Sequence, residues 1–119
     1  MPRTVKMAPY QRRGEDTEWG QHLYVMHAGA GAAPGLVKIG RSWSPHQRLE
    51  AVRRSCPMMD VELRATFPNL GVAESLVLAL MRRAHPRVGR SEWFACSDAE
   101  AVAAVAEALR MMREIQDRV

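Results

Sequence analysis

The sequence predicts an α+β fold in which a small three-stranded antiparallel sheet is flanked by helices, in the order β-β-α-β-α-α. Two short β-prone runs stand on either side of a segment rich in glycine and alanine, and a third run alternates apolar and polar residues. Two further segments begin with helix-capping patterns. A chain of 119 residues with 47% apolar residues is long enough to form one domain with its own core.

The first two strands are predicted over residues 22–26 (HLYVM) and 36–40 (LVKIG), as an antiparallel hairpin. The segment between them, AGAGAAPG, contains glycines, but no Gly-Lys-Ser/Thr follows and no helix begins there. It therefore does not match a phosphate-binding loop, and we interpret it as the hairpin tip.

The segment SPHQRLEAVRRS that follows the hairpin predicts a helix with its start signal in place. Ser44 can cap the helix, Pro45 suits the first helical position, and Gln47 stands three residues after the serine. Arg48 lies at the margin of the apolar face, so we expect its side chain to project past that face into a cleft. The apolar face comprises Leu49, Val52 and Cys56.

The third strand is predicted over residues 60–67 (DVELRATF), which alternate between apolar and polar side chains. A regular strand would place the apolar set on one face, and this is typical of a half-buried strand. The apolar set is Val61, Leu63, Ala65 and Phe67.

Two helices complete the predicted domain. Residues 71–84 are apolar on nearly every side, which predicts the central and most buried helix. After a short connection over residues 85–94, whose aromatic pair Trp93 and Phe94 is expected to seal the core, Ser97 and Glu100 form a capping box for a helix from about 98 to 116. Its apolar seam is expected to pack on the domain or on a second copy in a homodimer. The seam comprises Val102, Val105, Leu109 and Met112.

Residues 1–20 mix proline, glycine and both charges without periodicity, which predicts a flexible basic arm ahead of one domain over residues 21–119. The net charge is +4 with a pI near 9.7, and 15 of the 17 basic residues are arginines. Arginine suits phosphate recognition, so nucleic acid is the leading partner, with DNA favoured over RNA. The same charge excess is also common among domains that bind no nucleic acid.

The cysteines and the apolar runs bear on the expected location of the protein. Cys56 and Cys96 match neither a zinc pattern nor a dense disulfide framework, so both are expected to be small buried apolar residues in a reducing compartment. No run approaches the roughly 20 apolar residues of a membrane span, and the N-terminus lacks the apolar core of a signal peptide. We therefore expect a soluble, cytoplasmic protein.

Four ionisable side chains form a candidate site for phosphodiester chemistry. Tyr24 and Lys38 lie on the two predicted hairpin strands, Arg48 begins the next helix, and Glu74 stands in the first turn of the apolar helix. Cleavage of a phosphodiester needs a base for water, cations for the transition-state charge and an anchor for a divalent metal. Each residue also has a structural interpretation: a core tyrosine, a lysine with a buried stem, a surface ion pair and a carboxylate favoured by the helix dipole.

The order of these motifs resembles the GIY-YIG nuclease family. The matching segments are LYV, KIGR, an arginine eight residues after the glycine of KIG, AESLVLALM and SEWF, between about residues 23 and 94. The chain is most similar to the branch whose second motif reads KIG, found in phage open reading frames and proteins of meiotically up-regulated genes. The resemblance implies a three-stranded antiparallel sheet flanked by helices, as the residues themselves predict.

The resemblance also implies a role for each site residue. Tyr24 orients or deprotonates the attacking water, and Lys38 takes the place of the tyrosine of the second motif. Arg48 stabilises the pentacovalent phosphate, and Glu74 holds a single Mg²⁺ or Mn²⁺. Gly40 lets the phosphate approach the backbone, and the neighbouring Arg41 attracts it.

The expected function is therefore a metal-dependent endonuclease that nicks DNA, one strand per site. The chain departs from the family pattern at Ala51 and Val52, and again at Leu78, where many relatives carry a histidine. The alternative is a nucleic-acid-binding module that keeps the fold without turnover.

Overall fold

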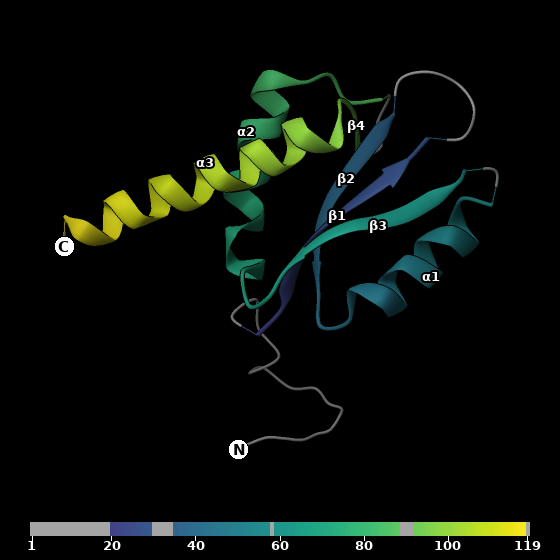
Figure 1. Ribbon diagram of the computed structural model, residues 1–119, viewed down its shortest axis with the longest axis horizontal. Coiled ribbons are helices and arrows are strands. Elements are labelled where there is room, and N and C mark those ends of the chain that lie inside the picture. The colour runs from purple at the N-terminus through teal and green to yellow at the C-terminus, as the bar shows by residue number, and fades with distance from the viewer. Residues whose placement is uncertain (1–19, 30–34, 58, 89–91, 119) are drawn as a thin grey trace, which may run out of the picture.

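The computed structural model describes residues 20–29, 35–57, 59–88 and 92–118, which form an α+β domain (Figure 1). Its four-stranded antiparallel sheet has the strand order β3-β1-β2-β4, and three α-helices pack on it. The predicted fold class is confirmed, whereas the predicted number of strands is wrong by one. The predicted arm lies outside the described residues except for Gly20, as does part of the hairpin tip. The elements are β1 (His22–Ala28), β2 (Leu36–Ser42), α1 (Pro45–Ser55), β3 (Val61–Phe67), the 3₁₀ turn η1 (Gly71–Ala73), α2 (Glu74–Ala84), β4 (Trp93–Ala95) and α3 (Asp98–Asp117).

The additional strand is β4, which pairs with the first half of β2. Its register places Trp93 opposite Lys38 and Phe94 opposite Val37. Three residues are too few to show the alternation from which strands are predicted, so only the pairing reveals it. Both aromatic side chains are buried, as expected, but successive strand residues point to opposite faces, and each joins a different core.

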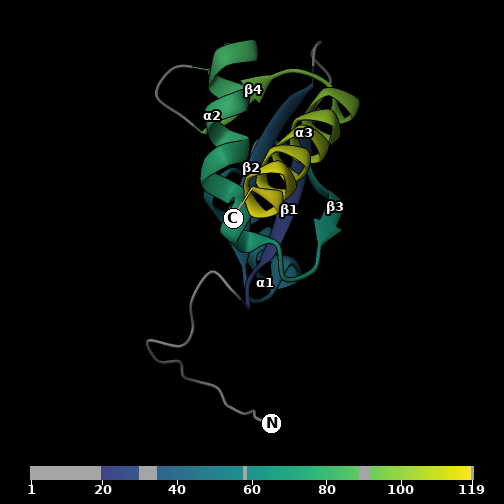
Figure 2. The same ribbon diagram turned by 90° about the vertical axis from the view of Figure 1, so that its left-hand side faces the viewer.

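The sheet is covered by α1 on one face and by α2 and α3 on the other, as the two views show (Figures 1 and 2). We call these the α1 face and the α2/α3 face. The α2/α3 face carries the larger core, formed with the helices by Leu23, Val25, Val37, Ile39, Ala73, Val77, Met81, Phe94, Cys96, Ala101, Val105 and Ala108. The α1 face carries the smaller core, formed by Tyr24, Met26, Ala28, Leu49, Val61 and Trp93.

A bulge in β3 overturns the prediction that its apolar residues share one face. Met26 of β1 pairs with Leu63, whereas the preceding residue Val25 pairs with Ala65, so Arg64 has no residue opposite it. One extra residue reverses the alternation. Leu63 therefore packs on the α1 face with Val61, whereas Ala65 packs on the α2/α3 face with Phe67.

Both predicted helix caps are confirmed, whereas the helix predicted from residue 71 begins at Glu74, after the 3₁₀ turn η1. The Ser44 side chain accepts a hydrogen bond from the Gln47 backbone at 3.4 Å, at the start of α1. At the start of α3, Ser97 Oγ accepts from the Glu100 backbone at 3.1 Å. Glu100 Oε1 in turn accepts from the Ser97 backbone at 2.9 Å. These bonds satisfy backbone donors that the helix itself leaves unpaired.

Helix packing differs from the prediction in two places. In α2 only Val77 and Met81 are buried, so this helix covers the edge of the domain instead of filling its centre. In α3 Val102 is 39% exposed, while Ala101 and Ala108 are buried beside Val105. Small residues let helices approach closely, so here the alanines contribute to the contact that larger side chains were expected to make.

Within the described ranges, no helix combines the length and apolarity needed to cross a membrane.

Candidate functional site

Charged side chains from four segments gather where the pairing of β4 with β2 ends at Lys38. Lys38 and Arg41 lie on β2, Arg48 lies in the first turns of α1, and Glu74 is the first residue of α2. Glu92 immediately precedes β4. The sequence predicted the first four, and the fifth enters through the strand pairing. We call these five residues the edge cluster.

The Lys38 ammonium donates a hydrogen bond to Glu92 Oε1 at 2.7 Å. The Lys38 side chain is 12% exposed and that of Glu92 is 70% exposed, so the lysine stem is covered while the carboxylate faces solvent. This hydrogen bond lowers the pKa of Glu92 below its usual range. Sequence reasoning gave Glu92 no role, because only the register between Trp93 and Lys38 brings it here.

The Glu74 carboxylate lies 3.4 Å from Arg41 Nε and is 22% exposed. Burial raises the pKa of Glu74, and the attraction of Arg41 partly offsets this effect. Glu92 raises the pKa further, and Lys38 lowers it. The carboxylate therefore carries a desolvation cost that its neighbours leave uncompensated, and added positive charge would stabilise its ionised form.

Arg48 lies between two hollows and lines both, which agrees with its predicted projection into a cleft. Ala51, one turn further along α1, lines both as well. The smaller hollow, about 230 Å³, is lined by Lys38, Arg48, Ala51, Val52, Ser55, Cys56 and Trp93. The larger, about 450 Å³, is lined by Gln21, Arg41, Ser42, Trp43, Ser44, Gln47, Arg48 and Ala51.

Tyr24 lies beneath this region, opposite Gly40 in the register of β1 and β2. Its side chain is 1% exposed and belongs to the smaller core. A Cβ atom at Gly40 would lie 2.9 Å from Tyr24 Cε1 and closer still to the hydroxyl oxygen. The phenol therefore occupies the space that a side chain at this position would need, which gives a structural reason for the glycine beside the expected approach of a phosphate.

The two β2 residues of the edge cluster, Lys38 and Arg41, lie on opposite faces of the strand. Lys38 and Gly40 have the parity of the α1 face, and Arg41 has that of the α2/α3 face. Glu74 nevertheless interacts with both Lys38 and Arg41, so the two cations flank the same carboxylate from the edge of the strand. The structure thus brings together Lys38, Arg41, Arg48 and Glu74, whereas Tyr24 is buried in the smaller core and lines neither of the two hollows.

A separate group of metal-ligating side chains lies where α2 ends and α3 begins. Ligand atoms of His85, Cys96 and Glu100 lie within 4.8 Å of one another. Burial, together with the nearby Glu100 and Asp98, raises the pKa of the Cys96 thiol to about 11, and Glu100 already serves the capping box. The capping role of Glu100 and the burial of Cys96 are both explained by the fold, and Glu74 is not part of this group.

Cys56 and Cys96 are both free, but Cys56 is only half-buried, contrary to expectation.

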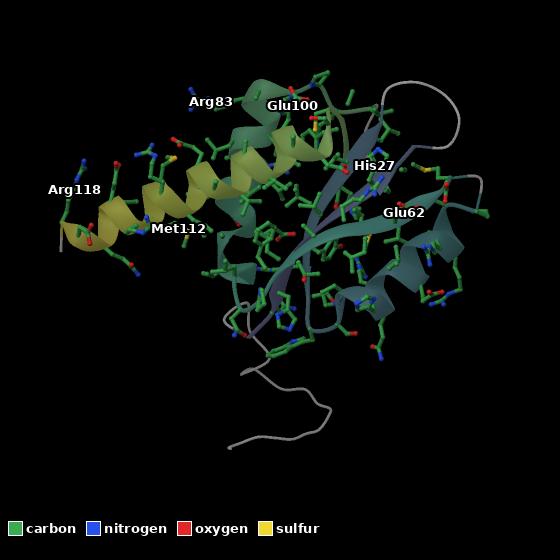
Figure 3. All side chains as sticks on the ribbon, viewed as in Figure 1. His27, Glu62, Arg83, Glu100, Met112 and Arg118 are labelled. Atoms are coloured by element: carbon green, nitrogen blue, oxygen red, sulfur yellow. The ribbon has the colours of Figure 1, made fainter. Side chains whose placement is uncertain are left out.

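Two charged residues on other elements can serve as matched controls for substitutions in the edge cluster, and both are labelled in Figure 3. Glu62 lies on β3, the opposite edge strand of the sheet, and Arg118 follows the last turn of α3. Both are exposed.

Comparison with known proteins assigns most of this domain to one family. The model of the T5orf172 domain matches residues 21–113, which span all four strands and most of α3. Neither the curated proteins nor the solved structures contain a match to the chain. The matched segment includes the whole edge cluster and exceeds half of the 119 residues. The chain therefore belongs to the T5orf172 domain family, a phage open-reading-frame family related to GIY-YIG-like nuclease folds.

Proposed function

We propose that the protein is a metal-dependent endonuclease that hydrolyses DNA phosphodiester bonds and nicks one strand at each site. The observation that carries this proposal is the edge cluster, in which cations from β2 and α1 surround a partly buried carboxylate from α2. Membership of the T5orf172 family supports it, because this domain is associated with nuclease-like and DNA-binding functions.

Glu74 is the residue that would hold Mg²⁺ or Mn²⁺. Hard divalent cations prefer carboxylate oxygens, and magnesium sites often use one or two carboxylates with water and substrate phosphate as the other ligands. The raised pKa of Glu74 fits this role, because a cation would offset the cost of burying the charge. When bound, the ion supplies charge stabilisation to the phosphoryl oxygens.

The side chains of the cluster suit hydrolysis by water. The water oxygen bonds to phosphorus and loses a proton, and the bond from phosphorus to one ester oxygen breaks. That leaving oxygen takes up a proton, so the products are a phosphate monoester and a hydroxyl. Arg48 and Arg41 would bind the non-bridging oxygens, on which negative charge develops. Lys38 is held in place by Glu92. The resemblance assigns the orientation of the attacking water to Tyr24. Its side chain is 1% exposed and lines neither of the two hollows, so in this proposal water would reach its hydroxyl beside Gly40.

The alternative is a nucleic-acid-binding module without turnover, and Ala51 is the observation that favours it. This residue lines both hollows, and with Val52 it stands where the resemblance leads us to expect a histidine. A methyl group neither accepts nor donates a proton. Under this alternative the same arginines bind phosphate, and the protein shows salt-sensitive binding without cleavage.

Nicking of supercoiled plasmid separates the two functions. The purified protein is incubated with Mg²⁺ or Mn²⁺, with EDTA as a parallel control, and compared with Glu74→Ala and Arg48→Ala. The matched controls are Glu62→Ala and Arg118→Ala, which remove the same charges far from the edge cluster (Figure 3).

We expect metal-dependent nicking that falls roughly a hundredfold or more in Glu74→Ala and Arg48→Ala, as for the loss of one transition-state contact, and that is unchanged in both controls. Nicking that survives Glu74→Ala would contradict the site assignment. Salt-sensitive binding without any nicking would favour the binding module.

A further inference from the structure

An aromatic side chain with no role in the proposed hydrolysis forms part of the larger hollow. Trp43 is 46% exposed, whereas the side chain of Trp93 is buried in the smaller core. Single exposed apolar residues are ordinary, but this indole lines the same hollow as Arg41 and Arg48. Sequence reasoning did not single it out, because it follows directly after β2 without a motif of its own.

The position of the Trp43 ring is set by a close approach of the chain. A Cβ atom at Gly20 would lie 3.4 Å from Trp43 Cζ2 and closer to the far edge of the indole. The ring therefore lies against the backbone just ahead of β1. This contact restricts the indole, so less side-chain entropy remains to be lost when a flat ligand binds to its exposed part.

The remaining lining of the hollow matches the parts of a nucleotide. Arg41 and Arg48 provide positive charge for a phosphate, and the indole provides a stacking surface for a base. The amides of Gln21 and Gln47 supply donors and acceptors for a base edge. The volume, about 450 Å³, lies within the range of roughly 300–1,000 Å³ typical of sites for small ligands.

The hollow also adjoins the proposed site of hydrolysis. Arg48 and Ala51 line both it and the smaller hollow, in which Lys38 lies. A nucleotide whose base rests on Trp43 would therefore be next to the phosphate held at the edge cluster. Within a continuous duplex a base is stacked on both sides and does not expose its face, so this nucleotide must be unpaired.

We infer that Trp43 is a stacking platform for an unpaired DNA nucleotide beside the scissile phosphate. This inference rests on the proposed function and deepens it by naming the substrate class: DNA with unpaired nucleotides at the cleavage point, such as a flap, gap or branch. The hollow favours these substrates over continuous duplex, in which a base must first be flipped out of the stack to present its face to the indole.

The test is equilibrium binding in EDTA, where no cleavage occurs, measured by fluorescence anisotropy of labelled DNA. The probes are a short thymidine oligonucleotide, the same oligonucleotide with abasic positions, and a duplex of equal length. The variants are Trp43→Ala, Trp43→Phe, which keeps an aromatic face, and Ile115→Ala, an exposed apolar control on α3. Circular dichroism establishes that each variant is folded.

We expect Trp43→Ala to weaken binding of the thymidine oligonucleotide about tenfold, since stacking of one base contributes about 1–3 kcal/mol and 1.4 kcal/mol is tenfold. Trp43→Phe retains most of the affinity, and Ile115→Ala retains all of it. The abasic oligonucleotide and the duplex bind wild type and Trp43→Ala equally. Equal losses for all three probes, or no loss for the oligonucleotide, would overturn the inference.

Failure of the inference is distinguishable from failure of the proposed function. If Trp43→Ala binds like wild type while metal-dependent nicking persists, the platform is wrong and the nuclease stands. If the platform behaves as expected while no metal-dependent nicking occurs on plasmid or flap DNA, the nuclease is wrong and the base-binding site stands. Tighter binding of a uridine oligoribonucleotide than of its DNA counterpart would overturn the assignment to DNA.

Discussion

The two faces of the sheet divide stability and chemistry between them. The α2/α3 face carries the larger core under two helices, one of which begins with a complete capping box. The α1 face carries the smaller core under a single helix, in which Pro45 and Leu49 are the buried residues. Both hollows lie beside this single helix, and Arg48 lines each of them.

The difference shows how a small domain keeps a polar site beside a stable core. Two helices on one face bury enough apolar surface to stabilise the sheet, so the other face does not need to be fully covered. The edge cluster lies along the line where the faces meet, because Lys38 and Arg41 leave β2 on opposite sides. Substitutions on the α2/α3 face are therefore expected to change stability, and those at the edge cluster to change chemistry.

The largest expected effect on stability comes from Phe94→Ala, within the larger core. This side chain is fully buried, and its removal leaves a cavity, so we expect a loss of about 3–5 kcal/mol in the free energy of unfolding. Denaturant unfolding followed by circular dichroism measures it. Ile115→Ala, at a residue that is 60% exposed, is the control and should change stability by less than about 0.5 kcal/mol. A small loss for Phe94→Ala would break the proposed division between the faces.

Gly40→Ala tests the packing of the α1 face, where Tyr24 lies against Gly40. The new methyl group would overlap the Tyr24 phenol, so we expect a loss of about 1–3 kcal/mol in the free energy of unfolding. A double-mutant cycle with Tyr24→Ala identifies the cause, because shortening the tyrosine removes the overlap. Additive effects of the two substitutions would show that the glycine is needed for another reason, such as the approach of a ligand.

Ser97→Ala tests the capping box that begins α3. The substitution removes the acceptor for the Glu100 backbone N–H, and we expect it to lower stability by about 1 kcal/mol. Thermal unfolding measures the change. Plasmid nicking by the folded variant should be unaffected, because the capping box belongs to the α2/α3 face. A selective loss of nicking would mean that the two faces are coupled through α3.

The smallest expected effect is a difference in protonation between Glu74 and Glu92. Burial raises the pKa of Glu74, and the hydrogen bond from Lys38 lowers that of Glu92, so NMR titration should find Glu74 protonated at the higher pH. Between its ordinary and raised pKa, Glu74 binds more protons in the folded state than in the unfolded state. It therefore contributes a decrease in stability as pH rises through that window.

Removing the titrating group checks the origin of this slope. Glu74→Gln cannot ionise, so this contribution to the pH dependence of stability should disappear. A stability profile identical to that of wild type would mean that burial of Glu74 has no energetic consequence. The reverse order of the two NMR midpoints would contradict the electrostatics of the edge cluster.

The parts of the fold that depend on neighbouring residues in the sequence were predictable. The caps at Ser44 and Ser97 follow from residues three positions apart, and the hairpin strands follow from short β-prone runs around a glycine-rich segment. Features of this kind depend on residues that are close together in the sequence, so the sequence is sufficient to predict them. The order of motifs also led us to expect Lys38, Arg48 and Glu74 near one another, and the structure brings them together, while their role in one site stays a prediction.

The α+β class, the starts of α1 and α3 and the set of candidate ionisable residues followed from the sequence alone, because each depends on periodicity, capping or residue chemistry. Only the tertiary structure decided that β4 pairs with β2 and brings Glu92 to Lys38, since that contact joins residues 54 positions apart. The bulge at Arg64 and the packing of the Tyr24 phenol against Gly40 also depend on strand pairing and are visible only in the structure. Register between strands depends on the packing of both faces at once, and no single segment contains that information.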